Sequence, residues 1–252
     1  MHEIPTVLLH GFGGSPEAWR SVIDAWPSHE ARPLFITPRQ PGHGAPIDTV
    51  EHFEDAVNAL AADLPDRFHL VGYSLGGRLA LGLVAQHPSR VVSLTLIGAH
   101  PGLDASARPA RQQNDLLWAQ RLQAMGTEAF FESWIQQPLF ASQRALPAHA
   151  LARQKTWRQH LNKDDLARAM RVLSLSTMPD YRPMLPTLTM PILLMAGEQD
   201  AKFVAISESM MAELPHGQLE IVKGVGHNIP LEAPDAVAQH LARFIGAVAA
   251  YR

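Results

Sequence analysis

One serine stands in a setting that favours nucleophilic or base chemistry. Ser74 is the central residue of the segment GYSLG, residues 72–76, which follows an apolar run and opens a stretch of helical period. At such a strand-to-helix turn the serine is strained, and flanking glycines are needed because a side chain there would collide with neighbouring backbone. The alternative is a surface turn that holds a serine by chance. The strand before it and the helix after it favour the reactive hydroxyl.

Two later residues have the chemistry that this serine requires. A serine hydroxyl reacts only when a histidine takes its proton, and a carboxylate must fix that histidine's tautomer. Asp200 follows the apolar run PILLMAGE, and His227 lies in GVGHN just after LEIV. Taken singly, Asp200 is also an ordinary helix cap before Phe203, and His227 a loop histidine. The order serine, aspartate, histidine favours a catalytic triad of Ser74, Asp200 and His227.

A glycine-rich segment after the first apolar run supplies donors for such a site. In LHGFGG, residues 9–14, the glycines let backbone N–H groups turn toward the serine. We expect the N–H groups of Phe12 and Leu75 to stabilise a negatively charged oxygen in the reaction. The alternative is a glycine turn that only reverses the chain.

A second loop, QPGHG at residues 40–44, is expected at the edge of the same site. Its His43 is expected to be structural, because no second histidine or carboxylate stands nearby at metal-ligand spacing. The 13 histidines are dispersed and cysteine is absent. We expect neither a metal site nor an organic cofactor.

Several basic residues have positions that favour an anionic substrate. Arg78 lies one turn into the helix that the serine opens, and Lys202 stands beside the predicted acid. Arg111 and Arg158 fall in a helical segment described below. Arginine holds carboxylates through two parallel hydrogen bonds, so a cluster of these cations fits a carboxylate ligand. For Arg111 or Arg158 taken alone, the alternative is a solvated helix face or a surface ion pair.

The elements that must position these residues alternate along the chain. Short leucine-rich and β-branched runs alternate with longer helical stretches, a pattern typical of a mostly parallel, doubly wound sheet covered on both faces. We expect strands at residues 6–9, 34–37, 69–72, 91–97, 192–196 and 218–222. We expect amphipathic helices at, among others, residues 50–64, 76–86 and 234–249.

The alternation stops between about residues 104 and 188. This stretch has many Arg, Gln and Ala residues and helical spacing, and it contains no convincing strand. It lies between the fourth and fifth expected strands, so it should emerge at the carboxyl ends of the strands, where ligands of open α/β sheets bind. We expect a single domain over residues 1–252 with a helical cap inserted at about residues 104–188.

Bulk composition excludes several classes of function. The chain has 252 residues and a formal net charge of -3, so no basic field attracts nucleic acid or acidic lipid. The longest apolar runs are far shorter than the roughly 18 residues of a membrane span. The first residues lack the basic start and cleavage site of a secretory signal, and the absence of cysteine is compatible with a reducing compartment. We expect a cytoplasmic protein without membrane insertion that binds a small molecule.

Together these segments resemble one family, the 2-succinyl-6-hydroxy-2,4-cyclohexadiene-1-carboxylate synthases of menaquinone biosynthesis, which have the α/β-hydrolase fold. The resemblance covers nearly the whole chain. It is carried by LHGFGG, QPGHG, GYSLGGR, HPGL, ARQQNDLLWAQR, WIQQPLFAS, PDYRP, GEQDAKF and GHN. The triad and HG segments are shared across the superfamily, whereas Arg78, HPGL, Arg111, Gln-Gln-Pro and Asp-x-Lys-Phe are much narrower.

The resemblance implies a lyase. Family members eliminate pyruvate from 2-succinyl-5-enolpyruvyl-6-hydroxy-3-cyclohexene-1-carboxylate, a substrate with three carboxylates. In the implied mechanism Ser74, activated by His227 and Asp200, removes a ring proton next to the succinyl carbonyl, and no acyl-enzyme forms. The three carboxylates give binding roles to Arg78, Arg111 and Arg158.

The resemblance also implies pocket positions for Tyr73, Trp134 and Lys202, although Trp134 also fits a buried core aromatic of the cap. Between residues 140 and 179 this chain is longer than the family members, and both Arg153 and Arg158 fit the third arginine position. Arg158 is preferred over Arg153 because it precedes Asn162 and Leu166 in better register.

Two other functions remain open at this point. An esterase or carbon-carbon bond hydrolase on the same scaffold would use the serine as a covalent nucleophile or to activate water. A receptor without catalytic activity that kept the fold is a third hypothesis, which the complete triad disfavours.

Overall fold

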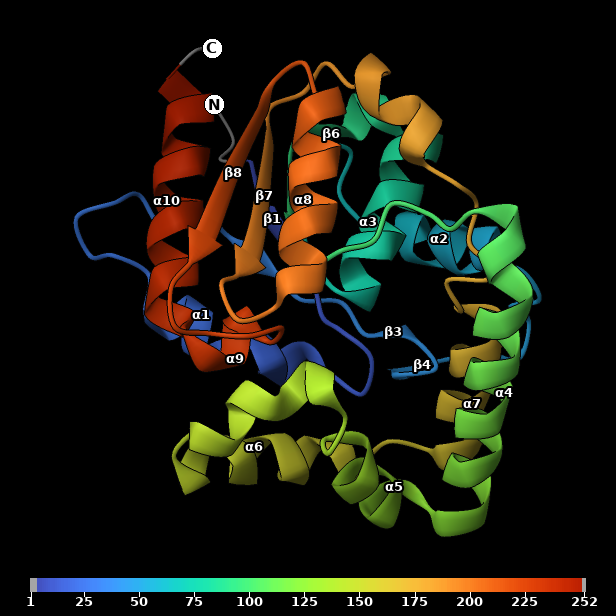
Figure 1. Cartoon of the computed structure of the whole chain (residues 1–252). Helices are drawn as coiled ribbons and strands as arrows, with labels where there is room; N and C mark the ends of the chain where they lie inside the picture. The colour runs from blue at the N-terminus through green and yellow to red at the C-terminus, as the bar shows by residue number, and fades with distance from the viewer. Residues whose placement is uncertain (1–3, 251–252) are drawn as a thin grey trace.

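The expected strands form one sheet of six parallel strands (Figure 1). The computed structural model describes residues 4–250. The strand order across the sheet is β2-β1-β5-β6-β7-β8. The strands are β1 Thr6–Leu9, β2 Phe35–Ile36, β5 Phe68–Tyr73, β6 Val91–Ile97, β7 Ile192–Gly197 and β8 Gly217–Val222. The expected strand at residues 34–37 is thus only two residues long, and a small separate ladder of β3 Gln40–Pro41 and β4 Gly44–Ala45 was not anticipated.

Helices cover both faces of this sheet, as the doubly wound pattern predicts (Figure 1). One face packs against α2 Phe53–Ala62, α3 Leu75–Gln86 and α8 Ala201–Glu213. The other packs against α1 Arg20–Asp24, α9 Ile229–Glu232 and α10 Pro234–Ala250. Strands β5, β6 and β7 are mostly apolar because both of their faces are buried in this way.

The inserted segment forms a cap at the carboxyl ends of the strands (Figure 1). Its helices are α4 Arg108–Met125, α5 Thr127–Trp134, α6 Ala148–Arg158 and α7 Lys163–Val172. The cap has a small core of its own, in which Phe130, Leu122 and Leu166 are fully buried. The last part of the predicted cap differs from the rest: Leu175, Met178 and neighbouring side chains after α7 pack into the main core against the sheet.

Short 3-10 turns complete the chain, at Pro16–Trp19, Pro88–Arg90, Ala105–Ala107, Pro138–Ala145 and Arg182–Thr187. Within residues 4–250, no helix combines the length and the apolar character needed to cross a membrane.

The turn between β5 and α3 brings Ser74 to the carboxyl edge of the sheet in a strained conformation. Its φ of 52° makes it the one non-glycine residue with positive φ in the described part of the chain. The turn is tight enough that a Cβ at Gly72 would lie 2.5 Å from the Gly76 carbonyl oxygen. A Cβ at Gly76 would collide with the Leu9 carbonyl of the neighbouring strand. The glycines on either side of the serine are therefore required by backbone contacts.

We predict that Gly76→Ala lowers the free energy of unfolding by about 1–3 kcal/mol, because the colliding atoms belong to backbone that has little room to move. Gly246→Ala is the matched control. It lies inside α10, where a Cβ meets only Glu30 at 3.7 Å, so it should stabilise by up to about 1 kcal/mol. Urea denaturation of both variants measures the difference. Equal effects would contradict the packing argument.

Candidate active site

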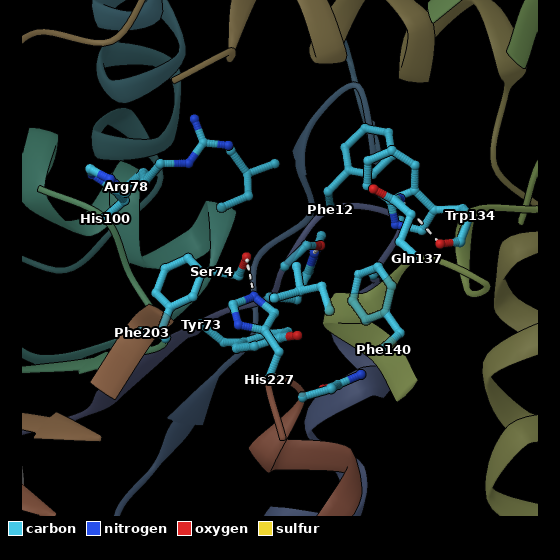
Figure 2. Close-up of a pocket in the computed structure, with 18 of the residues that line it drawn as sticks. Phe12, Tyr73, Ser74, Arg78, His100, Trp134, Gln137, Phe140, Phe203 and His227 are labelled. Atoms are coloured by element: carbon cyan, nitrogen blue, oxygen red, sulfur yellow. Dashed lines mark hydrogen bonds between the residues drawn. The ribbon is translucent and has the colours of Figure 1, made fainter. Parts of the chain in front are cut away.

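Three side chains from distant parts of the chain meet above the end of β5 (Figure 2). His227 Nε2 lies 3.2 Å from the Ser74 hydroxyl, and His227 Nδ1 lies 2.7 Å from an Asp200 carboxylate oxygen. His227 and Asp200 are both buried. A carboxylate at Nδ1 keeps the proton on that nitrogen, which leaves Nε2 free to accept the serine proton.

Asp200 has two roles that the sequence analysis treated as alternatives. It is the N-cap residue of α8, where its Oδ1 accepts the Phe203 N–H at 3.3 Å. Its other carboxylate oxygen faces His227. The helix cap therefore orients the carboxylate toward the histidine, since both oxygens are held at once.

Glu232 fixes the loop that carries His227, and the sequence analysis missed it. Its carboxylate accepts the N–H of Gly226 at 2.7 Å and that of Asn228 at 3.0 Å, on either side of the histidine. Phe203 packs on the imidazole with ring centroids 4.5 Å apart. The His227 imidazole is thus held in two ways: Glu232 fixes the backbone on either side of it, and Phe203 packs against its ring. A glutamate five residues after a histidine has no pattern that would have singled it out.

Residues of QPGHG hold the glycine-rich loop in place. His43 Nε2 accepts the Gly13 N–H at 3.0 Å, and the Gln40 amide donates to the His10 carbonyl at 2.9 Å. His43 therefore has the kind of structural contact that was expected. Burial lowers the pKa of His43 to about 4, and burial together with His43 lowers the pKa of His10 to about 3. Both imidazoles are neutral at pH 7 and act as fixed hydrogen-bonding groups.

The expected oxyanion donors, Phe12 and Leu75, both line the cavity beside Ser74. Leu75 is the first residue of α3, and N–H groups in a first helical turn have no partner within their helix. With Gly13 N–H committed to His43, the loop retains the N–H of Phe12 for a ligand. Their role in stabilising an oxyanion stays a prediction.

The cavity beside Ser74 lies between the sheet and the cap and has a volume of about 570 Å³. Its two ends differ in character. Arg78 and His100 lie on one side of the serine, while Phe12, Trp134 and Phe140 form an aromatic wall on the other (Figure 2). This volume is in the usual range of small-molecule sites.

All four predicted cationic side chains line this cavity: Arg78, Arg111, Arg158 and Lys202. Arg78 donates to the Leu173 carbonyl at 2.6 Å. Burial, and next the nearby Arg111, lowers the pKa of Arg78 to about 9. A buried cation that is destabilised in this way gains when an anion binds beside it.

Arg158, rather than Arg153, points into the site. Its guanidinium lies 4.2 Å from the ring centroid of Phe131, and its Nε donates to the Gly13 carbonyl at 3.4 Å. Burial lowers its pKa to about 10. Arg153 is exposed and is not among the residues that line the cavity. The two residues lie on different faces of α6, so helix orientation separates them.

The two predicted aromatic residues also line the cavity. Tyr73 packs against His227 with ring centroids 5.5 Å apart, and burial raises its pKa well above the usual value. Trp134 stacks on Phe130 at 5.4 Å and lies 5.5 Å from Phe12. Trp134 therefore belongs to the cap aromatic cluster and faces the site as well.

His100 adds a neutral group to the cationic end, and its role was not predicted. Its Nδ1 accepts the Gly102 N–H at 3.3 Å, which leaves Nε2 as a donor. Burial, followed by nearby Lys202 and Arg78, lowers its pKa to about 4. The HPGL segment was the signal available for it.

Over residues 4–250, no three histidine or carboxylate side chains lie in a group that fits a metal ion. That no cofactor takes part remains an expectation.

The parallel sheet, the strained serine and the inserted cap define a class of protein. The sequence profile of the alpha/beta hydrolase family matches residues 6–240, so the chain belongs to that family. Similarity to solved structures agrees: a thermophilic esterase from Thermogutta terrifontis has a TM-score of 0.81 and 22% identity, over 97% of this chain and 90% of that one. At that identity the likeness shows the fold alone.

Relatives with higher sequence identity to this chain indicate a narrower family. Proteins named 2-succinyl-6-hydroxy-2,4-cyclohexadiene-1-carboxylate synthase from Klebsiella pneumoniae and Salmonella typhimurium are 36% and 34% identical over 245 residues, 95% of this chain and 92% of each relative. The structure of MenH from S. aureus has a TM-score of 0.91 and 28% identity, and the match covers 97% of this chain and 94% of that one. The chain belongs to the 2-succinyl-6-hydroxy-2,4-cyclohexadiene-1-carboxylate synthase family within the alpha/beta hydrolases.

The neutral His43 makes stability depend on pH. Its pKa is about 6.5 when unfolded and about 4 when folded, so the unfolded chain binds more protons between these values. The stabilisation is complete above pH 6.5 and is lost as the pH falls toward 4. His43→Gln keeps an acceptor for Gly13 but takes up no proton, so its loss of unfolding free energy from pH 7.5 to 4.5 should be smaller by up to about 3 kcal/mol.

Urea denaturation at the two pH values measures this difference. His149→Gln, at an exposed histidine on α6, is the control and should behave as the wild type does. Equal acid sensitivity of wild type and His43→Gln would contradict the assignment of a neutral, buried His43.

Proposed function

We propose that this protein is a carbon-oxygen lyase that eliminates pyruvate from 2-succinyl-5-enolpyruvyl-6-hydroxy-3-cyclohexene-1-carboxylate and releases 2-succinyl-6-hydroxy-2,4-cyclohexadiene-1-carboxylate. The observation that carries the proposal is the cationic end of the cavity, where Arg78 and Arg111 lie within reach of the serine site. A substrate with three carboxylates matches that charge. The names of the relatives described above support the same reaction.

In the proposed mechanism the triad acts as a base. Ser74 takes the ring proton next to the succinyl carbonyl while His227 takes the serine proton, and Asp200 stabilises the imidazolium. The electron pair of the broken C2–H bond forms the C2=C3 double bond, the existing C3=C4 double bond shifts to C4=C5, and the C5–O bond to the enolpyruvyl group breaks. The departing enolpyruvate gains a proton from His227 and becomes pyruvate. No bond forms between the serine and carbon.

Charge develops on the succinyl carbonyl oxygen during proton removal, and we assign its stabilisation to the N–H groups of Phe12 and Leu75. Both residues line the cavity, and Leu75 directly follows Ser74 in the chain. The contacts of Gly13 and Gln40 hold the donor loop before substrate arrives, so little reorganisation is needed in the transition state.

The carboxylates of the substrate are assigned to the cations. Arg78 projects from the same helix as the serine turn, whereas Arg111 and Arg158 belong to the cap and Lys202 to α8. Tyr73 and Trp134 complete the proposed binding surface around the ring. We also place the reaction in the cytoplasm, with which the absence of cysteine is compatible.

A second function, ester or carbon-carbon bond hydrolysis, is favoured by one observation. The triad and donor loop would serve a covalent acyl-serine equally well, and the fold is that of an esterase also. What separates the two is the charge of the cavity, because an uncharged ester gains nothing from three arginines.

We predict that the purified protein releases pyruvate from the enolpyruvyl cyclohexene substrate and that Ser74→Ala lowers kcat by several orders of magnitude. Adding His227→Ala to Ser74→Ala should cost little more, because residues of one triad act as a unit. A coupled lactate dehydrogenase assay measures the pyruvate. A burst of product from an activated ester, with an acyl group trapped on the serine and no pyruvate from the cyclohexene, would support the hydrolase instead. If the wild-type protein turned over neither the cyclohexene substrate nor the activated ester, a receptor without catalytic activity would be supported.

We predict that Arg78→Ala, Arg111→Ala and Arg158→Ala each lower kcat/KM roughly 10- to 150-fold, because a charge-assisted hydrogen bond to a carboxylate is worth about 1.5–3 kcal/mol. Arg78 stands on the serine helix, so its loss should lower kcat as well as raise KM. The two cap variants should act mainly through KM.

Arg153→Ala is the matched control for Arg158→Ala, since both lie on α6 and only Arg158 lines the cavity. Steady-state pyruvate release compares the four variants. A large loss of kcat/KM in Arg153→Ala together with a wild-type kcat/KM in Arg158→Ala would contradict the assignment of the third arginine. Four variants near wild type would contradict an anionic substrate.

A further inference from the structure

A buried carboxylate stands at the cationic end of the cavity, where a negatively charged substrate would meet it. Within residues 4–250, the carboxylates that line the cavity are Asp115 and Asp200, and Asp200 faces His227. The Asp115 side chain is 6% exposed. By charge alone, Asp115 would repel a carboxylate ligand, so its place there needs a separate reason.

The contacts of Asp115 show what it does. Its Oδ2 accepts the Nε–H of Arg111 at 2.7 Å and the hydroxyl of Ser174 at 2.6 Å. Arg111 lies four residues earlier on α4, while Ser174 lies just beyond α7. The Asp115 carboxylate therefore links Arg111 of the cap to the segment that follows α7 and leaves the cap. Ser174 is held in turn by Ser176, whose N–H and hydroxyl lie 2.9 and 2.7 Å from its Oγ.

The same stretch of chain also holds Arg78. The Leu173 carbonyl, one residue before Ser174, accepts from Arg78 Nη1 at 2.6 Å. Asp115 raises the pKa of Arg78, against the effect of burial and of Arg111. Asp115 thus contacts Arg111 directly. It is linked to Arg78 through Ser174 and the neighbouring Leu173 carbonyl.

The atom by which Arg111 is held matters for binding. A guanidinium has five N–H donors in a planar fork, and Asp115 uses the one on Nε. The two terminal nitrogens remain available for a bidentate contact with a ligand carboxylate. Holding Nε fixes the plane of the fork, which lowers the side-chain entropy that Arg111 loses when a ligand binds.

We propose that Asp115 is a positioning residue that holds Arg111, and through Ser174 the chain beside Arg78, in the arrangement that binds the carboxylates of the substrate. This inference rests on the proposed function and goes beyond it, because it assigns substrate affinity to a negatively charged residue that the substrate need not touch.

Positioning and simple charge have opposite consequences for one substitution. Asp115→Asn removes a negative charge from a site for a polyanion, so charge alone would lower KM. Loss of the Arg111 and Ser174 contacts to a carboxylate should instead raise KM at least about 10-fold, with kcat changed little. Glu208→Gln, at an exposed position on α8 outside the cavity, makes the same change of charge and should leave both constants as in wild type.

The decisive measurement is KM and kcat for pyruvate release in wild type, Asp115→Asn, Ser174→Ala and Glu208→Gln, with thermal unfolding as a check on folding. Ser174→Ala keeps the carboxylate and should raise KM in the same direction by a smaller factor, so it tests the proposal even if Asp115→Asn folds poorly. An unchanged or lower KM in both Asp115→Asn and Ser174→Ala would overturn the proposal.

A double-mutant cycle tests whether Asp115 acts through Arg111. In the background of Arg111→Ala, Asp115→Asn should raise KM by less than about threefold, since Arg111 is gone and only the contact through Ser174 remains. A full, additive effect in that background would show that Asp115 does not act through Arg111, and would overturn the proposal.

Binding without turnover separates this inference from the proposed function. Titration calorimetry with propane-1,2,3-tricarboxylate as the probe should give a Kd that rises at least about 10-fold in Asp115→Asn and is unchanged in Glu208→Gln. If wild type releases no pyruvate, the proposed function fails and this titration alone decides the inference. A probe that binds wild type and Asp115→Asn equally, or does not bind wild type, overturns it.

Discussion

The strained turn at Ser74 is the constraint on which the rest of the site depends. Its positive φ occurs where Gly72 and Gly76 let strand and helix backbones approach closely, and its hydroxyl faces His227 Nε2. Once the serine has this place, His227 must come from the loop after β8 and Asp200 from the end of β7. A parallel sheet brings the carboxyl ends of its strands to one edge. The topology of the sheet therefore also brings these three side chains together.

Burial disfavours the charged form of both the histidines and the arginines of the site, with different consequences for each. It keeps His10 and His43 uncharged, so they serve as hydrogen-bonding supports for the donor loop. It also destabilises the charge on Arg78 and Arg158, which are held by backbone carbonyls instead of carboxylates. Positive charge without a full partner is a cost to the free protein that an anionic ligand can offset.

The cap has an aromatic core of its own, and it contacts the rest of the chain through aromatic packing on Phe12 and through hydrogen bonds from Trp157 and Arg168. Trp134 packs against that core and also lines the cavity. Asp115 and Ser174 join the cap to the chain that returns to the sheet. In the proposed function, affinity for the substrate depends on how the cap is held, because Asp115 holds Arg111 at this junction.

Much of the fold was determined by local pattern: apolar runs and helical periods placed all six strands of the main sheet, and the GYSLG segment located the serine turn. Other features depended on side-chain direction. Arg153 and Arg158 are five residues apart on one helix, and the orientation of α6 on the rest of the chain decides that Arg158 lines the cavity. The contacts of Asp115 and Glu232 join residues through backbone and hydroxyl groups that carry no sequence signal. A sequence shows periodicity along the chain, whereas these contacts exist only after distant elements have packed.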